Sequence, residues 1–161
     1  MSQPEPLPSN DEEAVAAFWQ RFLSTSESTL AFTDVATFGD NVALADKLIA
    51  LVINGPKRAT AGSVAEYEAA GTRLPEVGDC WIACDGAGRP RAVLRTTDCR
   101  VGPLVSVDES FAWDEGEGDR TRDNWLDMHR RHLDRTLPAL DVISNDDTPV
   151  VFERFEVVYT E

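Results

Sequence analysis

Two helix boundaries lie close together in the N-terminal half of the chain, and they constrain the fold more than any other feature. An apolar helical pattern stops at Gly55-Pro56, because proline cannot continue a helix and restricts the residue before it. Ser63-x-x-Glu66 has the form of a capping box, which predicts that another helix begins there. The connector between them is predicted to be non-helical, and it contains two adjacent cations and a hydroxyl: Lys57, Arg58 and Thr60.

This connector allows two interpretations. Loops that are held by rigid elements at both ends often carry function. The alternative is a solvated turn between two helices, in which Lys57 and Arg58 meet acidic neighbours. Both interpretations stay open on the connector alone.

Helical patterns come first in the sequence, and strand-like patterns follow. Apolar spacing and capping residues predict helices at about residues 11–23, 40–54, 64–70, 106–112 and 121–135, with only a weak pattern over 24–37. Strands are predicted at Cys80–Cys84, Pro90–Val101 and Pro149–Tyr159, and residues 85–88 are typical of a hairpin turn. This order favours an α+β fold with a small curved sheet or barrel.

The domain organisation predicted from the sequence is simple. The 161 residues are enough for one domain with a substantial core, and we find neither an internal repeat nor a domain boundary. Residues 1–10 contain three prolines together with Ser and Asn, so we expect a disordered N-terminal tail. Residues 11–161 are expected to form the single domain.

Charge and cysteine content limit the classes of partner. The chain has 15 Lys and Arg against 29 Asp and Glu, a net charge of −14, so binding to duplex DNA is not expected. A small ligand or a few nucleotides in a local basic cleft stay possible, and the charge can also serve solubility alone.

No apolar run reaches the length of a membrane span, and no secretory signal is apparent. Three cysteines without zinc-site spacing or even pairing fit a cytoplasmic protein.

A second unusual stretch runs from Trp113 to Arg120 and crowds carboxylates together. Their mutual repulsion would raise some of their pKa values unless cations such as Lys57 or Arg120 neutralise them. If this stretch meets the basic connector, a lysine, a threonine hydroxyl and a glutamate share one cleft, a set that can perform acyl transfer. The lysine would accept the threonine proton, the hydroxyl would attack a carbonyl, and a carboxyl group would pass a proton to the departing amine. The alternative is an acidic surface loop.

Metal binding has less support in the sequence. The acidic stretch lacks the alternating ligand pattern of a calcium loop. His129 and His132 are three residues apart on a predicted helix, but no third ligand completes a zinc site. We therefore expect no metal site, and we expect both histidines to have structural or substrate-wall roles.

Several short motifs occur together in one order along the chain: Gly55-x-Lys57-x-x-Thr60, Glu66-Tyr67-Glu68, Pro75-x-x-Gly78-Asp79, Phe111-Ala112-x-x-Glu115-Gly116-Glu117-Gly118-Asp119-Arg120, Trp125 and Val150-Val151-Phe152-Glu153-Arg154-Phe155. In this combination they resemble the ASCH-domain family of the PUA-like superfamily, over roughly residues 12–159. The Glu-Gly-Glu-Gly-Asp-Arg run is the most specific part. The resemblance implies a PUA-like fold, a small β-barrel flanked by helices with an N-terminal helical segment, and a cleft associated with RNA or modified nucleosides.

The resemblance also implies two activities. One is an amidohydrolase that removes acyl groups from the exocyclic amine of cytidine, whose lysine, threonine and glutamate fall on Lys57, Thr60 and Glu115. The other is metal-dependent cleavage of single-stranded RNA. The long N-terminal helices and the extra acidic residues 117–119 depart from the small amidohydrolases.

Three functions therefore stay open, in this order: the amidohydrolase without a cofactor, the ribonuclease with a divalent metal, and a non-catalytic reader in which Trp113 or Trp125 stacks on a base. The expected partner is a small nucleoside or a short single-stranded RNA, with neither duplex DNA nor a membrane. The amidohydrolase mechanism needs Lys57 and Glu115 in one cleft, with Glu115 either protonated or distant from the lysine in the reactive state. The residues expected to bind substrate are Arg58, Trp113, Glu117, Arg120 and Trp125.

Overall fold

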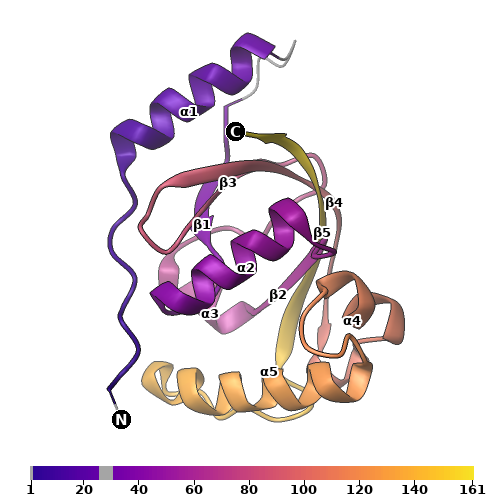
Figure 1. Cartoon of the computed structure of the whole chain (residues 1–161). Helices are drawn as coiled ribbons and strands as arrows, with labels where there is room; N and C mark the ends of the chain where they lie inside the picture. Colours follow the sequence, from indigo (N-terminus) through magenta and orange to yellow (C-terminus); the bar gives the residue numbers. More distant parts are fainter. Residues whose placement is uncertain (1, 26–30) are drawn as a thin grey trace. The chain divides into compact units, whose positions relative to one another are not determined.

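The computed structural model describes residues 2–25 and 31–161, which divide into two compact units. The first unit comprises Met1–Gly55, Gly78–Thr96 and Glu156–Glu161, and the second comprises Pro56–Val77 and Thr97–Phe155. Two long strands, β4 (Pro90–Pro103) and β5 (Pro149–Thr160), contribute residues to both units. Figure 1 follows the chain from its N-terminus to its C-terminus.

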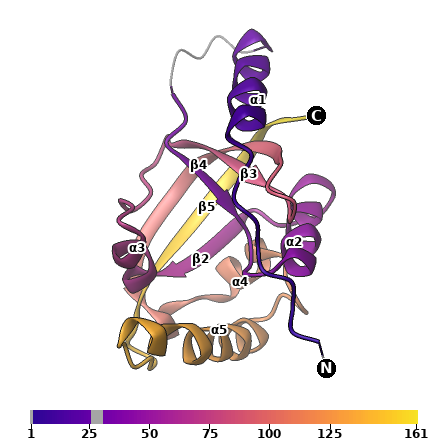
Figure 2. The ribbon, with the colours of Figure 1, turned by 90° about the vertical axis from the view of Figure 1, so that its left-hand side faces the viewer.

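The strands form a five-stranded sheet in the order β1-β3-β4-β5-β2. In the first unit, β1 (Asp34–Thr37) pairs in parallel with β3 (Cys80–Cys84), and β3 pairs antiparallel with β4 across the predicted hairpin turn. In the second unit, β2 (Ala59–Ser63) pairs antiparallel with β5, beside which it lies in Figure 2. The three strands predicted from the sequence are confirmed, and β1 and β2 were not predicted.

The missed strands have a common cause: both are short and lack an alternating apolar pattern. The first, β1, lies in the weak segment 24–37, part of which falls outside the described residues. The second, β2, has the sequence Ala-Thr-Ala-Gly-Ser, and it is a strand because β5 supplies a full antiparallel register from Ala59↔Arg154 to Ser63↔Val150. The expected connector is therefore corrected: Thr60 lies in a strand and not in a loop.

In the first unit, aromatic residues of α1 (Glu12–Thr25) form a core with the inner residues of β3, and α2 (Val42–Asn54) belongs to the same unit. Phe18 packs edge-on against Tyr159, with ring centroids 5.2 Å apart. The cap of α2 differs from the prediction, because Asn41 and not Asp40 accepts the hydrogen bond from Leu44 N. Ahead of α1, Glu5 O accepts a hydrogen bond from Val42 N (3.0 Å).

The second unit holds the short helix α3 (Val64–Ala70) and the two helices that build the site, α4 (Glu109–Glu115) and α5 (Arg122–Thr136). Thr121 caps α5 as predicted, by accepting from Asn124 N. The short helix predicted at 106–112 lies later in the chain: residues 104–106 form a 3₁₀ turn, and Asp108 caps α4 by accepting from Phe111 N. The apolar core of this unit includes Phe111, Trp125 and Phe152.

The architecture confirms the predicted α+β class, with five α-helices and one five-stranded sheet in the described part of the chain. The predictions of a disordered tail and of a single domain over residues 11–161 stay predictions. None of the helices described is both long and apolar enough to cross a membrane.

Candidate active site

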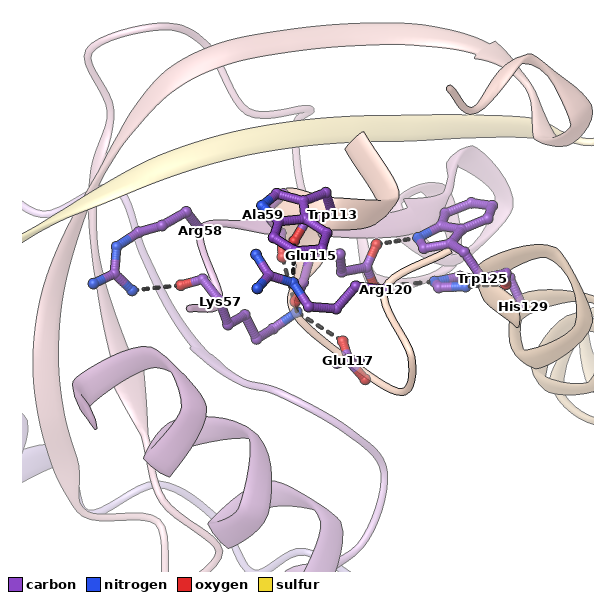
Figure 3. A network of polar contacts seen from close by, with 9 residues as sticks. All are labelled: Lys57, Arg58, Ala59, Trp113, Glu115, Glu117, Arg120, Trp125 and His129. Carbon is purple, nitrogen blue, oxygen red and sulfur yellow. Dashed lines mark hydrogen bonds and ion pairs between the residues drawn. The ribbon is translucent and has the colours of Figure 1, made fainter. Parts of the chain in front are cut away.

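Lys57 lies just before β2 in the second unit and is almost completely buried, with 1% of its surface exposed. A lysine this deep is rare unless its charge is paired. Its Nζ donates to Ala59 O (2.8 Å), to Glu115 O (3.3 Å) and to the carboxylate oxygen Oε2 of Glu117 (2.7 Å). Three acceptors match the three protons of an ammonium group, so the pocket around Nζ is suited to a charged lysine (Figure 3).

Glu115 ends α4 and is also buried, with 3% of its surface exposed. Its Oε2 accepts the indole N–H of Trp125, and its Oε1 lies 3.2 Å from His129 Nε2. Burial alone would raise the pKa of this carboxyl, but the charges of His129 and Lys57 outweigh burial and hold its pKa well below its ordinary value. Glu115 is therefore ionised at neutral pH.

His129 completes this pair from α5, one turn after Trp125. Its ring stacks on the indole with centroids 3.7 Å apart, and its Nδ1 lies 2.9 Å from Trp125 O. A carbonyl oxygen and an ionised carboxylate only accept, so both ring nitrogens carry protons. Burial lowers the pKa of His129, but Glu115 raises it by more, and the net shift is upward. His129 and Glu115 thus form a buried ion pair.

The pKa of Glu117 shifts in the opposite direction from that of Glu115, although the two residues are only two positions apart. Its side chain keeps 21% of its surface exposed while bonding to Lys57. Burial and the neighbouring charge of Glu115 raise the pKa of Glu117, and Lys57 only partly offsets them. The site therefore contains one carboxyl group whose pKa is lowered and one whose pKa is raised.

The backbone of the acidic stretch explains how two neighbouring glutamates reach different surroundings. Gly116 ends α4 in the left-handed conformation (φ 71°), and a Cβ on it would lie 2.9 Å from Lys57 Cα and N. Gly118 is also left-handed (φ 60°). Arg58 N donates to Asp114 O (2.7 Å), so a main-chain hydrogen bond joins the basic connector to the acidic stretch.

The structure brings Lys57 close to Glu115, as the sequence led us to expect, and it also joins Lys57 to Glu117, a contact that was not predicted. The contact to Glu115 is made by its main-chain carbonyl, and its carboxylate points to Trp125 and His129 (Figure 3). Thr60 lies on β2 opposite Glu153 of β5. Because side chains alternate along a strand, Thr60 faces the opposite side of β2 from its neighbour Ala59, which belongs to the core.

The residues expected to bind substrate fall into two groups. Trp113 is exposed over 57% of its surface, and the guanidinium of Arg120 lies 3.6 Å above its ring while Arg120 Nε donates to Trp113 O. Trp125, in contrast, is buried between His129 and Phe152, so it supports Glu115 and presents no face to a base. The side chain of Arg58 donates to Lys57 O and points away from the network in Figure 3.

Sequence reasoning placed His129 near Trp125 but missed its contact with Glu115. The available signal is the four-residue spacing of Trp125 and His129, which puts both on one face of α5.

His132 lies 3.6 Å from a carboxylate oxygen of Glu66. Within residues 2–25 and 31–161, no cluster of three His, Cys, Asp or Glu side chains is arranged to hold a metal ion.

Known proteins resemble this chain in sequence and in structure. A family model described as the ASCH domain matches residues 34–159. A crystal structure of a protein from Enterococcus faecalis is 35% identical and has a TM-score of 0.83, with 91% of this chain and 88% of that chain covered. A crystal structure of an ASCH domain from Lactobacillus crispatus is 27% identical with a TM-score of 0.83, over 92% of this chain and 96% of that one. No curated protein matches the sequence at a significant level.

Proposed function

Because the chain belongs to the ASCH-domain family, as its motifs indicated, we propose that it is an amidohydrolase that removes an acyl group from the exocyclic amine of cytidine or a related nucleobase. In this reaction water adds to the amide carbonyl, the carbon–nitrogen bond breaks, and a carboxylate and a free amine leave. The reaction needs a group that stabilises the oxyanion and a group that moves a proton from water to nitrogen.

One observation carries the proposal: Lys57 is buried as the partner of Glu117, beside the fixed charge of Glu115. A buried ion pair is poor evidence for stability, since desolvating both charges offsets much of their attraction. Glutamates with pKa values shifted in opposite directions are typical of acid–base sites. The cost of burying these charges therefore supports a catalytic role more than a structural one.

The proposed roles follow from this geometry. The ammonium of Lys57, whose protons already meet Ala59 O, Glu115 O and Glu117, acts through its charge and stabilises the negative charge that develops on the carbonyl oxygen. The role of Thr60 comes from its place in the family motif and not from a contact in the site: its hydroxyl positions the water or attacks the carbonyl. The mechanism expected from the sequence requires Glu115 to be protonated or distant from Lys57. Glu115 does not meet this requirement, because it is ionised and close to Lys57. We propose instead that Glu115 serves as a fixed negative charge, held in place by Trp125 and His129.

Substrate recognition is assigned to the exposed Trp113 and the half-buried Arg120 that lies on it. The guanidinium of Arg120 covers one face of the indole and offers donors for carbonyl oxygens, and the exposed indole offers a flat surface of the kind on which nucleobases stack. The net charge of −14 favours a substrate with little charge of its own over RNA. A small uncharged nucleoside is therefore the proposed partner.

The test uses the two lysines of the chain, Lys47 and Lys57. Purified protein is incubated with N4-acetylcytidine, and released acetate is measured. Lys57→Ala is expected to lower kcat/KM by about 10²–10³, the typical effect of removing a group that stabilises the oxyanion. Lys47→Ala removes an exposed lysine of α2 and is expected to leave kcat/KM unchanged.

A parallel incubation with a short single-stranded RNA and a divalent metal separates the alternatives. RNA fragments without acetate release would support the ribonuclease, and binding without turnover would support a reader. Either result, or a Lys57→Ala protein as active as the wild type, would overturn the amidohydrolase proposal.

A further inference from the structure

We propose that Glu117, and not Glu115, is the carboxyl group that exchanges protons with the substrate and water. This inference rests on the proposed amide hydrolysis and assigns the proton transfer within the same site. It departs from the expectation based on motif position, which gave that role to the glutamate that follows Phe111-Ala112.

Glu115 is unsuited to proton exchange because both of its carboxylate oxygens are already engaged. One accepts the indole N–H of Trp125, and the other faces the protonated ring of His129 at 3.2 Å. A proton on Glu115 would have to replace one of these two donors. With 3% of its surface exposed, the carboxylate also has almost no contact with solvent.

Glu117 meets each condition that Glu115 fails. One of its oxygens bonds to Lys57 Nζ at 2.7 Å, so it lies beside the proposed oxyanion-stabilising group. One fifth of its side chain is exposed, so a substrate and a water molecule can reach it. Burial and the charge of Glu115 next to it both favour the protonated form and raise the pKa of Glu117, which is the direction that an acid–base carboxyl needs at neutral pH.

The backbone enforces this division between the two glutamates. Left-handed glycines flank Glu117 on both sides, at Gly116 and Gly118, so the chain turns sharply before and after it. Figure 3 shows the result: Glu115 points toward Trp125 and His129, and Glu117 reaches Lys57 from the loop that follows. Two glutamates separated by one glycine thus pair with different cations, His129 and Lys57, while their carboxyl groups also interact with each other.

The proton transfer balances with water as the only co-substrate. The ionised form of Glu117 takes one proton from water while the water oxygen bonds to the amide carbon, and Lys57 stabilises the resulting oxyanion. The oxyanion then collapses, the carbon–nitrogen bond breaks, and protonated Glu117 gives the same proton to the departing amine nitrogen. The carboxylic acid product releases its own proton to solvent, and Glu117 is again ionised.

The experiment compares Glu117→Gln with Glu115→Gln and with the exposed control Glu76→Gln, whose side chain is 76% exposed in the wild type. The pH dependence of kcat/KM on N4-acetylcytidine is the readout, and thermal unfolding checks that each variant is folded. Glu117→Gln should lower kcat/KM by about 10²–10⁴. It should also remove the acidic limb of the profile, which is the fall of kcat/KM toward low pH. Glu115→Gln should keep that limb on whatever activity remains, and Glu76→Gln should match the wild type.

Chemical rescue makes the test independent of how well one variant folds. In Glu117→Ala, added formate can replace the missing carboxylate, and we expect it to restore part of the rate, while Glu115→Ala should gain nothing from formate. If the wild-type protein hydrolyses the substrate and Glu117→Gln keeps both the wild-type rate and the loss of kcat/KM at low pH, this inference is overturned while the proposed function stands. Wild-type protein without turnover would instead overturn the proposed function.

Discussion

Lys57 is a charged residue that the fold accepts only because its three protons meet three acceptors. Two of these acceptors are main-chain carbonyls, which cannot take up a proton in its place. The third is the carboxylate of Glu117, the acceptor whose charge depends on pH. At the scale of single residues, the charge next to Lys57 therefore depends on the ionisation of Glu117.

His129 provides a prediction about stability and pH. Its pKa is raised in the folded protein by Glu115, so the folded state binds its proton more tightly than the unfolded state does. The stabilisation is fully present below the ordinary histidine pKa of about 6.5 and is lost as pH rises through the higher folded pKa. We expect the unfolding free energy, measured by urea denaturation from pH 6 to 9, to fall with pH in the wild type and to fall less in His129→Gln.

His132 on the same helix is the matched control, since it is more exposed and contacts Glu66 instead of Glu115. His132→Gln should retain the pH dependence of the wild type over the same range. Identical slopes for His129→Gln and the wild type would show that the pair with Glu115 does not stabilise the fold.

At the scale of elements, the glycine that ends α4 determines how the residues of the candidate site are placed. Both α3 and α4 end in a left-handed glycine, Gly71 (φ 67°) and Gly116 (φ 71°). A methyl group on Gly71 would meet nothing within 4 Å, whereas one on Gly116 would lie 2.9 Å from the backbone of Lys57. The two glycines thus share a conformation and differ in their surroundings.

This difference predicts distinct effects of the same substitution. Gly71→Ala should cost about 1–2 kcal/mol of unfolding free energy, the usual penalty for a left-handed residue with a side chain. Gly116→Ala should cost more and should also lower kcat/KM, because the backbone of Lys57 must move. Equal losses of stability in the two variants, with activity unaffected in both, would contradict the close approach of Gly116 to Lys57.

At the scale of the whole molecule, the net charge of −14 acts on every charged ligand that approaches. A substrate with a 5′-phosphate should bind less well than the uncharged nucleoside at low salt, because the protein field repels it. We expect a loss of up to about tenfold in kcat/KM for the monophosphate, which added salt should reduce by screening. The uncharged nucleoside serves as the control and should show little dependence on salt.

Steady-state kinetics at low and at high ionic strength check this prediction. A monophosphate that is preferred at low salt would instead indicate a local cationic contact, for which Arg58 and Arg120 are the candidates. That outcome would move the proposed substrate class toward nucleotides and short RNA.

The sequence by itself determined the features that depend on neighbouring residues. Helix caps, the Gly-Pro stop and the hairpin turn act over a few positions, so Thr121, Gly55-Pro56 and the turn at 85–88 could be assigned correctly. The family, the α+β class and the charged stretches that contain Lys57, Glu115 and Glu117 could be identified in the same way.

Tertiary structure alone decided the features that depend on residues far apart in the chain. β1 and β2 are strands because β3 and β5 pair with them, and neither has a strong pattern of its own. The contact of His129 with Glu115 joins two helices, and it sets which glutamate stays ionised. Because a pKa reflects burial and nearby charges in space, the sequence could indicate the acidic residues of the site but not the role of each.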